Sequence, residues 1–147
     1  LSSDSPLQRF KTTSYMENIM ARREAGMAGA DEAVFRNEKG NICETSTANI
    51  FLADSEKLVT PSPASGALPG ITRKVVLELA GDSNIDISER EVSPRELQDS
   101  GEAFLTNSIM GIMPLVALNS KPIGRGRPGP VTGLLARKYR ERLENLA

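Results

Sequence analysis

Apolar and polar positions alternate over several short stretches, which is the pattern of half-buried β-strands. The alternation predicts strands over residues 32–36, 42–45, 49–53, 57–60, 86–92, 103–106 and 113–118. The first two are separated by Asn-Glu-Lys-Gly at 37–40, a hairpin turn signal. A second polar turn at 54–56 separates the next two strands. The pattern therefore predicts a hairpin-rich sheet.

Helical periodicity appears in four other places. We expect helices over residues 14–26, 72–80 and 93–98, and a last helix from residue 131 onward. Ser14 and Ser93 are candidate N-caps, because each has a glutamate three residues later. The last helix places Leu134, Leu135, Tyr139 and Leu143 on one face. Strands and helices together predict a mixed α/β fold.

The chain of 147 residues fits one domain: a polar linker or tail at 1–10, and no boundary after residue 11. A net charge of −1 with scattered basic residues argues against nucleic acid or an anionic membrane as partner. No apolar run approaches the roughly 20 residues of a membrane span, and the N-terminus lacks a signal-peptide pattern. The single cysteine, Cys43, is compatible with a reducing cytoplasm.

The absence of histidine restricts the chemistry that this chain can perform. It excludes Ser-His and Cys-His dyads and histidine-based metal sites within the chain, and we expect no metal. Reactivity must then rest on lysine, carboxylates, hydroxyls, backbone donors or a bound cofactor.

Two charged residues are candidates for such chemistry, although each also has an ordinary explanation. Lys11 is either a solvated surface lysine or a partly desolvated amine able to form an imine. Glu44 lies in a predicted strand, where a carboxylate usually faces solvent. If it is buried, it needs a cationic partner such as a protonated pyridine nitrogen.

Two polar segments are candidate anion sites. Gly-Ile-Thr-Arg at 70–73 opens a predicted helix, whose free N–H groups and dipole favour phosphate, and Thr72 adds a hydroxyl. The segment is equally explained as a glycine turn with Thr72 as N-cap. Thr-Asn-Ser at 106–108 is either an ordinary turn or a second hydrogen-bonding corner for the anion.

The order of these segments resembles the class IV (fold type IV) aminotransferases, which depend on pyridoxal 5'-phosphate (PLP). The resemblance rests on Lys-Thr-Thr-Ser-Tyr-Met-Glu-Asn at 11–18, Ala-Arg-Arg-Glu-Ala at 21–25, Glu-Thr-Ser-Thr-Ala-Asn-Ile-Phe at 44–51 and Leu-Pro-Gly-Ile-Thr-Arg at 68–73. It covers nearly all of residues 10–140. It implies the large domain of that fold, with a hairpin-rich sheet or barrel-like core and flanking helices.

The resemblance also implies roles for individual residues. Lys11 would form the Schiff base with PLP and move the proton between the substrate's α-carbon and the cofactor's C4′. Glu44 would pair with the pyridine nitrogen, and Tyr15 would reach the 3′-oxygen. The phosphate would be held by Ile71, Thr72 and Ser108.

The motifs point to more than one subfamily. Thr-Asn-Ser-Ile-Met-Gly-Ile-Met-Pro at 106–114 and the short spacing from Lys11 to Tyr15 look most like aminodeoxychorismate lyases. Such an enzyme converts 4-amino-4-deoxychorismate to 4-aminobenzoate and pyruvate. Gly-Ala-Leu-Pro-Gly-Ile-Thr-Arg at 66–73 is equally at home in branched-chain aminotransferases. The lyase is the leading prediction, with branched-chain or D-amino-acid aminotransferases as the alternative.

The resemblance implies a smaller N-terminal domain ahead of this lysine, and we expect residues 1–147 to lack it. We therefore expect residues 11–147 to be the PLP-binding large domain, with an amino acid or aminodeoxychorismate as substrate and a homodimer as the assembly. A catalytically inactive fragment or a non-catalytic assembly domain is the remaining alternative.

Overall fold

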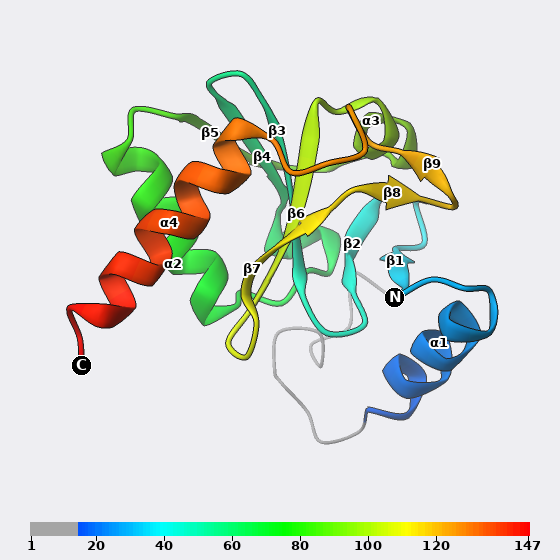
Figure 1. Cartoon of the computed structure of the whole chain (residues 1–147). Helices are drawn as coiled ribbons and strands as arrows, with labels where there is room; N and C mark the ends of the chain where they lie inside the picture. The colour runs from blue at the N-terminus through cyan, green and yellow to red at the C-terminus, as the bar shows by residue number, and fades with distance from the viewer. Residues whose placement is uncertain (1–14) are drawn as a thin grey trace.

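The computed structural model describes residues 15–147, so Lys11 and the expected tail at 1–10 lie outside the described residues. Figure 1 shows the helices α1 (Met16–Met27), α2 (Ile71–Asp82), α3 (Pro94–Asp99) and α4 (Pro130–Glu144). A short 3₁₀ helix, η2 (Pro63–Ser65), precedes α2. The strands are β1 (Val34–Arg36), β2 (Ile42–Thr45), β3 (Asn49–Asp54), β4 (Lys57–Pro61), β5 (Asp86–Arg90), β6 (Glu102–Asn107), β7 (Gly111–Leu115), β8 (Ala117–Leu118) and β9 (Lys121–Pro122).

The described residues form one five-stranded sheet of order β5-β4-β3-β6-β7 and two separate pairs, β1-β2 and β8-β9. Only β4 and β5 are parallel in the large sheet, and α2 makes the crossover between them. The other neighbours are antiparallel. The predicted mixed α/β fold is confirmed, and its core is an open sheet rather than a closed barrel.

Strand β3 is buried on both faces, and its alternation divides the core into two clusters. Ile50 and Leu52 pack into one cluster, and Phe51 and Ala53 pack into the other. Because strand side chains point alternately to opposite faces, one central strand feeds both clusters. Phe51 stacks on Phe104 of β6 with ring centroids 5.0 Å apart. Each buried side chain of this size contributes about 1.5–3 kcal/mol.

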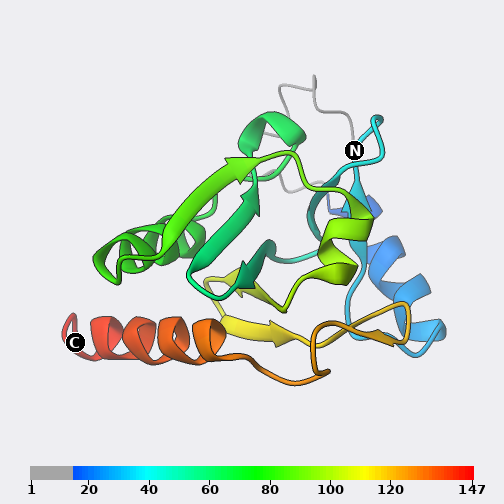
Figure 2. The same ribbon diagram turned by 90° about the horizontal axis from the view of Figure 1, so that it is seen from above.

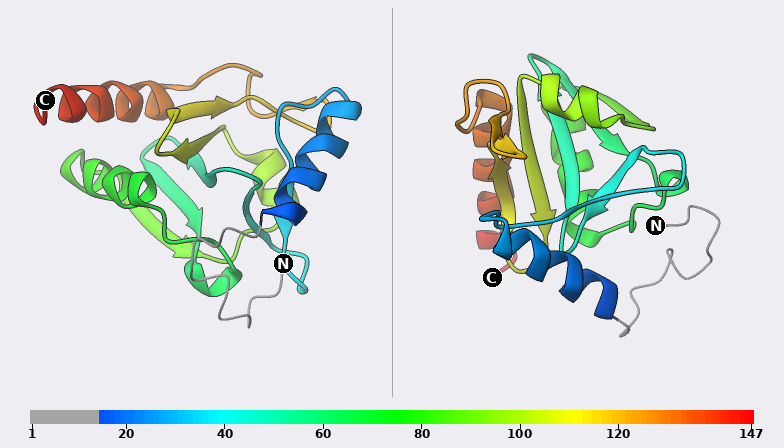
Figure 3. Two further views of the ribbon diagram at one scale, coloured as in Figure 1. Left: turned by 90° about the horizontal axis from the view of Figure 1, so that it is seen from below. Right: turned by 90° about the vertical axis from the view of Figure 1, so that its right-hand side faces the viewer.

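Helices α2 and α4 lie side by side over one face of the sheet (Figures 1 and 2). They contribute Val76, Leu79 and Leu135 to the cluster that contains Phe51. The β1-β2 pair and α3 lie toward the other face, where Ile42 and Leu97 join the second cluster. Helix α1 lies at the periphery, away from α2 and α4 (Figure 3).

A buried carboxylate attaches α4 to the central sheet. Glu102 in β6 is 5% exposed and accepts hydrogen bonds from Val131 N (3.0 Å), Thr132 N (2.9 Å) and Thr132 Oγ1 (2.6 Å). The N-cap residue itself, Gly129, has no side chain, and a Cβ there would overlap the carboxylate of Glu102. Glu102 therefore satisfies free N–H groups of the first turn from outside the helix.

Most of the predicted elements are present, with differences at their ends. Ser93 is the N-cap of α3 and accepts a hydrogen bond from Glu96 N, as expected (3.1 Å). Helix α1 is capped by Tyr15 without a side-chain hydrogen bond, and the candidate cap Ser14 is outside the described residues. The short pair β8-β9 was not predicted. Within residues 15–147, no helix combines the length and apolar character needed to cross a membrane.

Candidate active site

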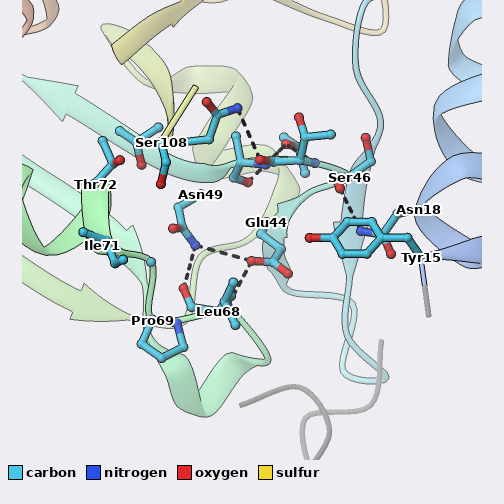
Figure 4. A pocket seen from close by; sticks show the side chains of 16 residues that line it. Tyr15, Asn18, Glu44, Ser46, Asn49, Leu68, Pro69, Ile71, Thr72 and Ser108 are labelled. Carbon is cyan, nitrogen blue, oxygen red and sulfur yellow. Dashed lines mark hydrogen bonds between the residues drawn. The ribbon is translucent and has the colours of Figure 1, made fainter. Parts of the chain in front are cut away.

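A cavity of about 320 Å³ lies where four segments of the chain meet. These segments are the beginning of α1, the stretch from β2 into β3, the loop leading into α2, and the turn between β6 and β7 (Figure 4). The lining residues are Tyr15, Asn18, 44–49, 68–72 and 106–108. Segments up to 93 positions apart in the sequence thus share one cavity.

Every predicted site residue within the described chain lines this cavity: Tyr15, Glu44, Ile71, Thr72 and Ser108. Figure 4 shows Thr72 and Ser108 on one side of the cavity, Glu44 toward the other, and Asn49 between them. Lys11 is outside the described residues, so its position relative to the others stays a prediction. The roles of the five lining residues in cofactor binding also stay predictions.

Glu44 is partly buried in β2, and no described residue supplies a cation to it. Its Oε2 accepts hydrogen bonds from Leu68 N (2.9 Å) and Asn49 Nδ2 (3.3 Å). Burial raises the pKa of Glu44 to about 7, and the hydrogen bond from Leu68 opposes this rise. A carboxylate held in this way favours a ligand that brings positive charge to it.

Asn49, at the beginning of β3, connects the two ends of the cavity. Its Nδ2 donates to Leu68 O (2.8 Å) as well as to Glu44. Its Oδ1 lies directly against Gly70, where a Cβ would overlap it. The side chain of Asn49 therefore fixes the loop before α2 relative to the carboxylate.

Helix α2 begins at the cavity with Ile71 and Thr72. Its N-cap is Gly70, which has extended backbone and provides no side-chain cap, so Thr72 is not the N-cap. The first N–H groups of a helix lack intrahelical acceptors and favour an anion. The buried Arg73 anchors this turn through Nη2, which donates to Pro61 O (3.1 Å) and Glu89 Oε2 (2.6 Å).

The turn between β6 and β7 brings hydroxyl groups to the same cavity. Ser108 lines it, and Thr106 is 2% exposed. Among residues 15–147, no hydrogen-bond partner reaches Thr106 Oγ1. Leaving a buried hydroxyl without a hydrogen bond destabilises the folded state by about 1–3 kcal/mol. A ligand that forms a hydrogen bond with Thr106 Oγ1 would therefore bind more tightly.

These groups fit a ligand with a protonated nitrogen at one end and an anion at the other. The carboxylate of Glu44 suits the nitrogen, and the first turn of α2 with Ser108 suits the anion. A pyridoxal phosphate molecule has this distribution of charge. In the part of the chain that the structure describes, no three metal-ligating side chains cluster together.

Asn18, Asn49 and Asn107 also contribute to the cavity walls. The sequence indicates the segments that contain them, but it gives none of these three asparagines an individual role. Each acts through hydrogen bonds to backbone groups distant in the sequence. The available signals were the runs at 11–18 and 44–51, which contain Asn18 and Asn49, and the candidate anion site at 106–108, which contains Asn107.

The described residues form a mixed α/β fold, with a cavity between the carboxylate of Glu44 and the first turn of α2. A family model described as amino-transferase class IV matches residues 1–118. The chain therefore belongs to the class IV aminotransferase family.

Similar proteins include both candidate subfamilies. A probable branched-chain-amino-acid aminotransferase of Thermotoga maritima is 37% identical over 92% of this chain and 49% of its own length. The PLP form of the Thermobaculum terrenum branched-chain aminotransferase has a TM-score of 0.92 and 32% identity, covering 97% of this chain and 47% of its own. A putative 4-amino-4-deoxychorismate lyase of Legionella pneumophila has a TM-score of 0.89 and 30% identity, covering 95% and 52%. The chain thus spans about half the length of these relatives.

Proposed function

We propose that this chain is the PLP-binding domain of a class IV aminotransferase. The observation that carries the proposal is the carboxylate of Glu44, with its pKa raised to about 7, in the same cavity as the N-terminus of α2. A protonated pyridine nitrogen would supply the missing positive charge at Glu44, and a phosphate would supply the anion at α2. The PLP form of the T. terrenum relative, 32% identical, supports the same cofactor.

PLP, when bound, supplies an electron sink for the electron pair released at the substrate's α-carbon. Glu44 would keep the proton on the ring nitrogen. Backbone N–H groups of Ile71 and Thr72, the Thr72 hydroxyl and Ser108 would hold the phosphate, and Tyr15 would orient the 3′-oxygen. Lys11 would hold the cofactor's aldehyde and move the proton at the substrate's α-carbon.

For the substrate, we place a branched-chain amino acid first, which reverses the order that the sequence motifs gave. Relatives named as branched-chain aminotransferases, from Aquifex aeolicus, Thermotoga maritima and Pseudomonas aeruginosa, are 36%, 37% and 33% identical. An aminodeoxychorismate lyase of Bacillus subtilis is 29% identical. The lyase remains the second candidate because of the short spacing from Lys11 to Tyr15. An activity assay separates the two candidates. Amino transfer from leucine to 2-oxoglutarate would support the branched-chain aminotransferase, and release of 4-aminobenzoate would support the lyase.

Borohydride reduction tests the cofactor assignment. The wild-type chain incubated with PLP should show the visible absorbance of a Schiff base. Reduction should abolish that absorbance and fix the cofactor covalently, with the added mass on the peptide containing Lys11. Lys11→Ala should lose this label. Lys39→Ala is the matched control, because Lys39 lies in the β1-β2 turn with 62% of its side chain exposed.

Two results would contradict the proposal. Retention of reducible cofactor by Lys11→Ala would reject Lys11. Absence of any uptake at saturating PLP would instead favour a non-catalytic assembly domain.

A homodimer is part of the proposal. The exposed Met16, Ile19, Met20 and Met27 on α1 support an assembly surface, since apolar side chains of this size are usually covered. Sedimentation of a monomer at all concentrations would argue against it.

A further inference from the structure

The side chain of Asn107 closes the turn that presents Ser108 to the cavity. Asn107 is the last residue of β6, and its Oδ1 accepts hydrogen bonds from Ile109 N (3.0 Å) and Met110 N (2.7 Å). Its Nδ2 donates to Thr47 O (3.3 Å) across the cavity wall. One side chain thus fixes the turn internally and attaches it to the loop between β2 and β3.

Packing contributes little to the position of this turn. The side chain of Ile109 is 95% exposed and that of Met110 is 53% exposed. Apolar side chains that remain in water cannot hold a loop by burial. The antiparallel pairing of Asn107 with Gly111 fixes the base of the turn. Within the turn, the side-chain hydrogen bonds of Asn107 constrain the residues that follow it, including Ser108.

Asn37 makes the same arrangement in the turn between β1 and β2. Its Oδ1 accepts from Lys39 N and Asn41 N (both 3.0 Å), and its Nδ2 donates to Ser65 O (3.1 Å). Asn37 is 6% exposed and does not line the cavity. Within residues 15–147, Asn107 closes a turn at the cavity, and Asn37 closes a similar turn away from it.

We propose that Asn107 is a positioning residue, which holds the hydroxyl of Ser108 where it binds the cofactor's phosphate. Asn107 acts through Ser108 and the loop at Thr47, without touching the cofactor itself. The inference rests on the proposed function, because it assumes that Ser108 contacts the phosphate.

The affinity ratio between PLP and pyridoxal isolates this role, since pyridoxal lacks only the phosphate. Both dissociation constants are measured by absorbance titration of the full chain. Ser108→Ala should lower the wild-type preference for PLP about tenfold, as expected for one hydrogen bond to a charged group. Asn107→Ala should lower it by about the same factor. Asn37→Ala should leave the ratio unchanged.

The double variant shows whether Asn107 acts through Ser108. If it does, Asn107→Ala combined with Ser108→Ala should lower the preference no further than Ser108→Ala alone. Independent effects would multiply to about a hundredfold. Amide hydrogen exchange supplies a readout without cofactor: the Ile109 and Met110 amides should exchange faster in Asn107→Ala, and no faster in Asn37→Ala.

The outcomes separate this inference from the proposed function. An unchanged ratio in Asn107→Ala, with a reduced one in Ser108→Ala, overturns the positioning role and leaves the proposed function intact. Multiplicative losses in the double variant also overturn it. A wild-type chain that binds PLP no better than pyridoxal rejects Ser108 as a phosphate ligand and the inference with it. Binding of neither compound rejects both proposals.

Discussion

Glu44 affects both the ligand that the cavity can bind and the stability of the folded chain. The partly buried carboxylate of Glu44, to which no described residue supplies a cation, resists ionisation, and burial raises its pKa to about 7. The hydrogen bonds from Leu68 and Asn49 orient the group but reach only Oε2 among the described residues. The site is therefore prepared for a cationic ligand and is less stable without one.

We predict that the stability of the cofactor-free chain falls as pH rises from about 4.5 to 7. The unfolded Glu44 ionises near 4.5 and the folded one near 7, so the folded state binds more protons within this window. Ionisation then costs the folded state up to roughly 3 kcal/mol above pH 7. Denaturant unfolding at several pH values measures this. Glu44→Gln should remove the dependence and be the more stable protein at pH 8.

Saturating PLP provides the complementary test at this residue. A protonated ring nitrogen beside Glu44 favours the carboxylate, so bound cofactor should flatten the pH dependence of the wild type. Glu56→Gln, in the exposed β3-β4 turn, is the control that changes charge without burial. An equal slope in wild type and Glu44→Gln would show that Glu44 is not the titrating group.

At the scale of elements, helix α2 depends on a close approach that only glycine permits. Gly70 precedes the helix and touches Asn49 Oδ1, whereas Gly81, near the end of the same helix, has nothing within 4 Å of an added Cβ. The same substitution at the two positions should therefore have opposite effects.

We predict that Gly70→Ala displaces Asn49 and destabilises the chain by about 1–3 kcal/mol, as overpacking does. It should also weaken PLP binding, because both Asn49 and the first turn of α2 move. Gly81→Ala should stabilise the chain by about 0.5–1 kcal/mol, since alanine is the better helix former. Thermal unfolding and PLP titration measure both. Equal stability of the two variants would contradict the close contact at Gly70.

The sequence predicts elements better than it predicts their surroundings. The N-cap at Ser93, whose side chain accepts a hydrogen bond from Glu96 N, is a local contact, so α3 could be located from a few residues. The side chain of Glu96 itself pairs with Arg90. The face of α4 was predicted to include Leu143, yet Leu143 is 49% exposed. Periodicity predicts which side chains share one face of a helix. It does not predict whether neighbouring elements extend far enough to bury all of them.

The same distinction explains the site. Glu44, Thr72 and Ser108 were found because their chemistry is visible in the residue type and in the family resemblance. Asn49 and Asn107 act by joining backbone groups 19 and 60 positions away. Such contacts exist only after the sheet has formed, so spacing along the chain could not reveal them.

At the scale of the whole molecule, the central strands of the described chain are well buried, whereas helix α1 makes few contacts with the rest. Strands β3 and β6 are buried almost throughout, and the cavity lies where their ends meet the flanking loops. No side chain of α1 is buried against the described part of the chain. Yet Tyr15 and Asn18, at the beginning of α1, line the cavity.

We predict that α1 opens far more easily than the sheet in the cofactor-free chain. Its apolar Met16, Ile19, Met20 and Met27 are exposed. Within residues 15–147, a side-chain hydrogen bond from Asn18 Nδ2 to Ser46 O (2.8 Å) links it to the rest of the chain. Local opening costs little where few apolar contacts are broken. Amide hydrogen exchange should therefore show α1 exchanging well before β3 and β6.

Two additions to the exchange experiment show what covers α1. PLP should slow exchange at its beginning, where Tyr15 and Asn18 face the cavity. A second copy of the chain should instead slow exchange along its whole apolar stripe, and more so at higher protein concentration. Asn18→Ala removes the link to Ser46 and should speed exchange in α1 without changing β3 and β6. Protection of α1 equal to that of β3 at every protein concentration, with no cofactor present, would mean that α1 is held by contacts other than these.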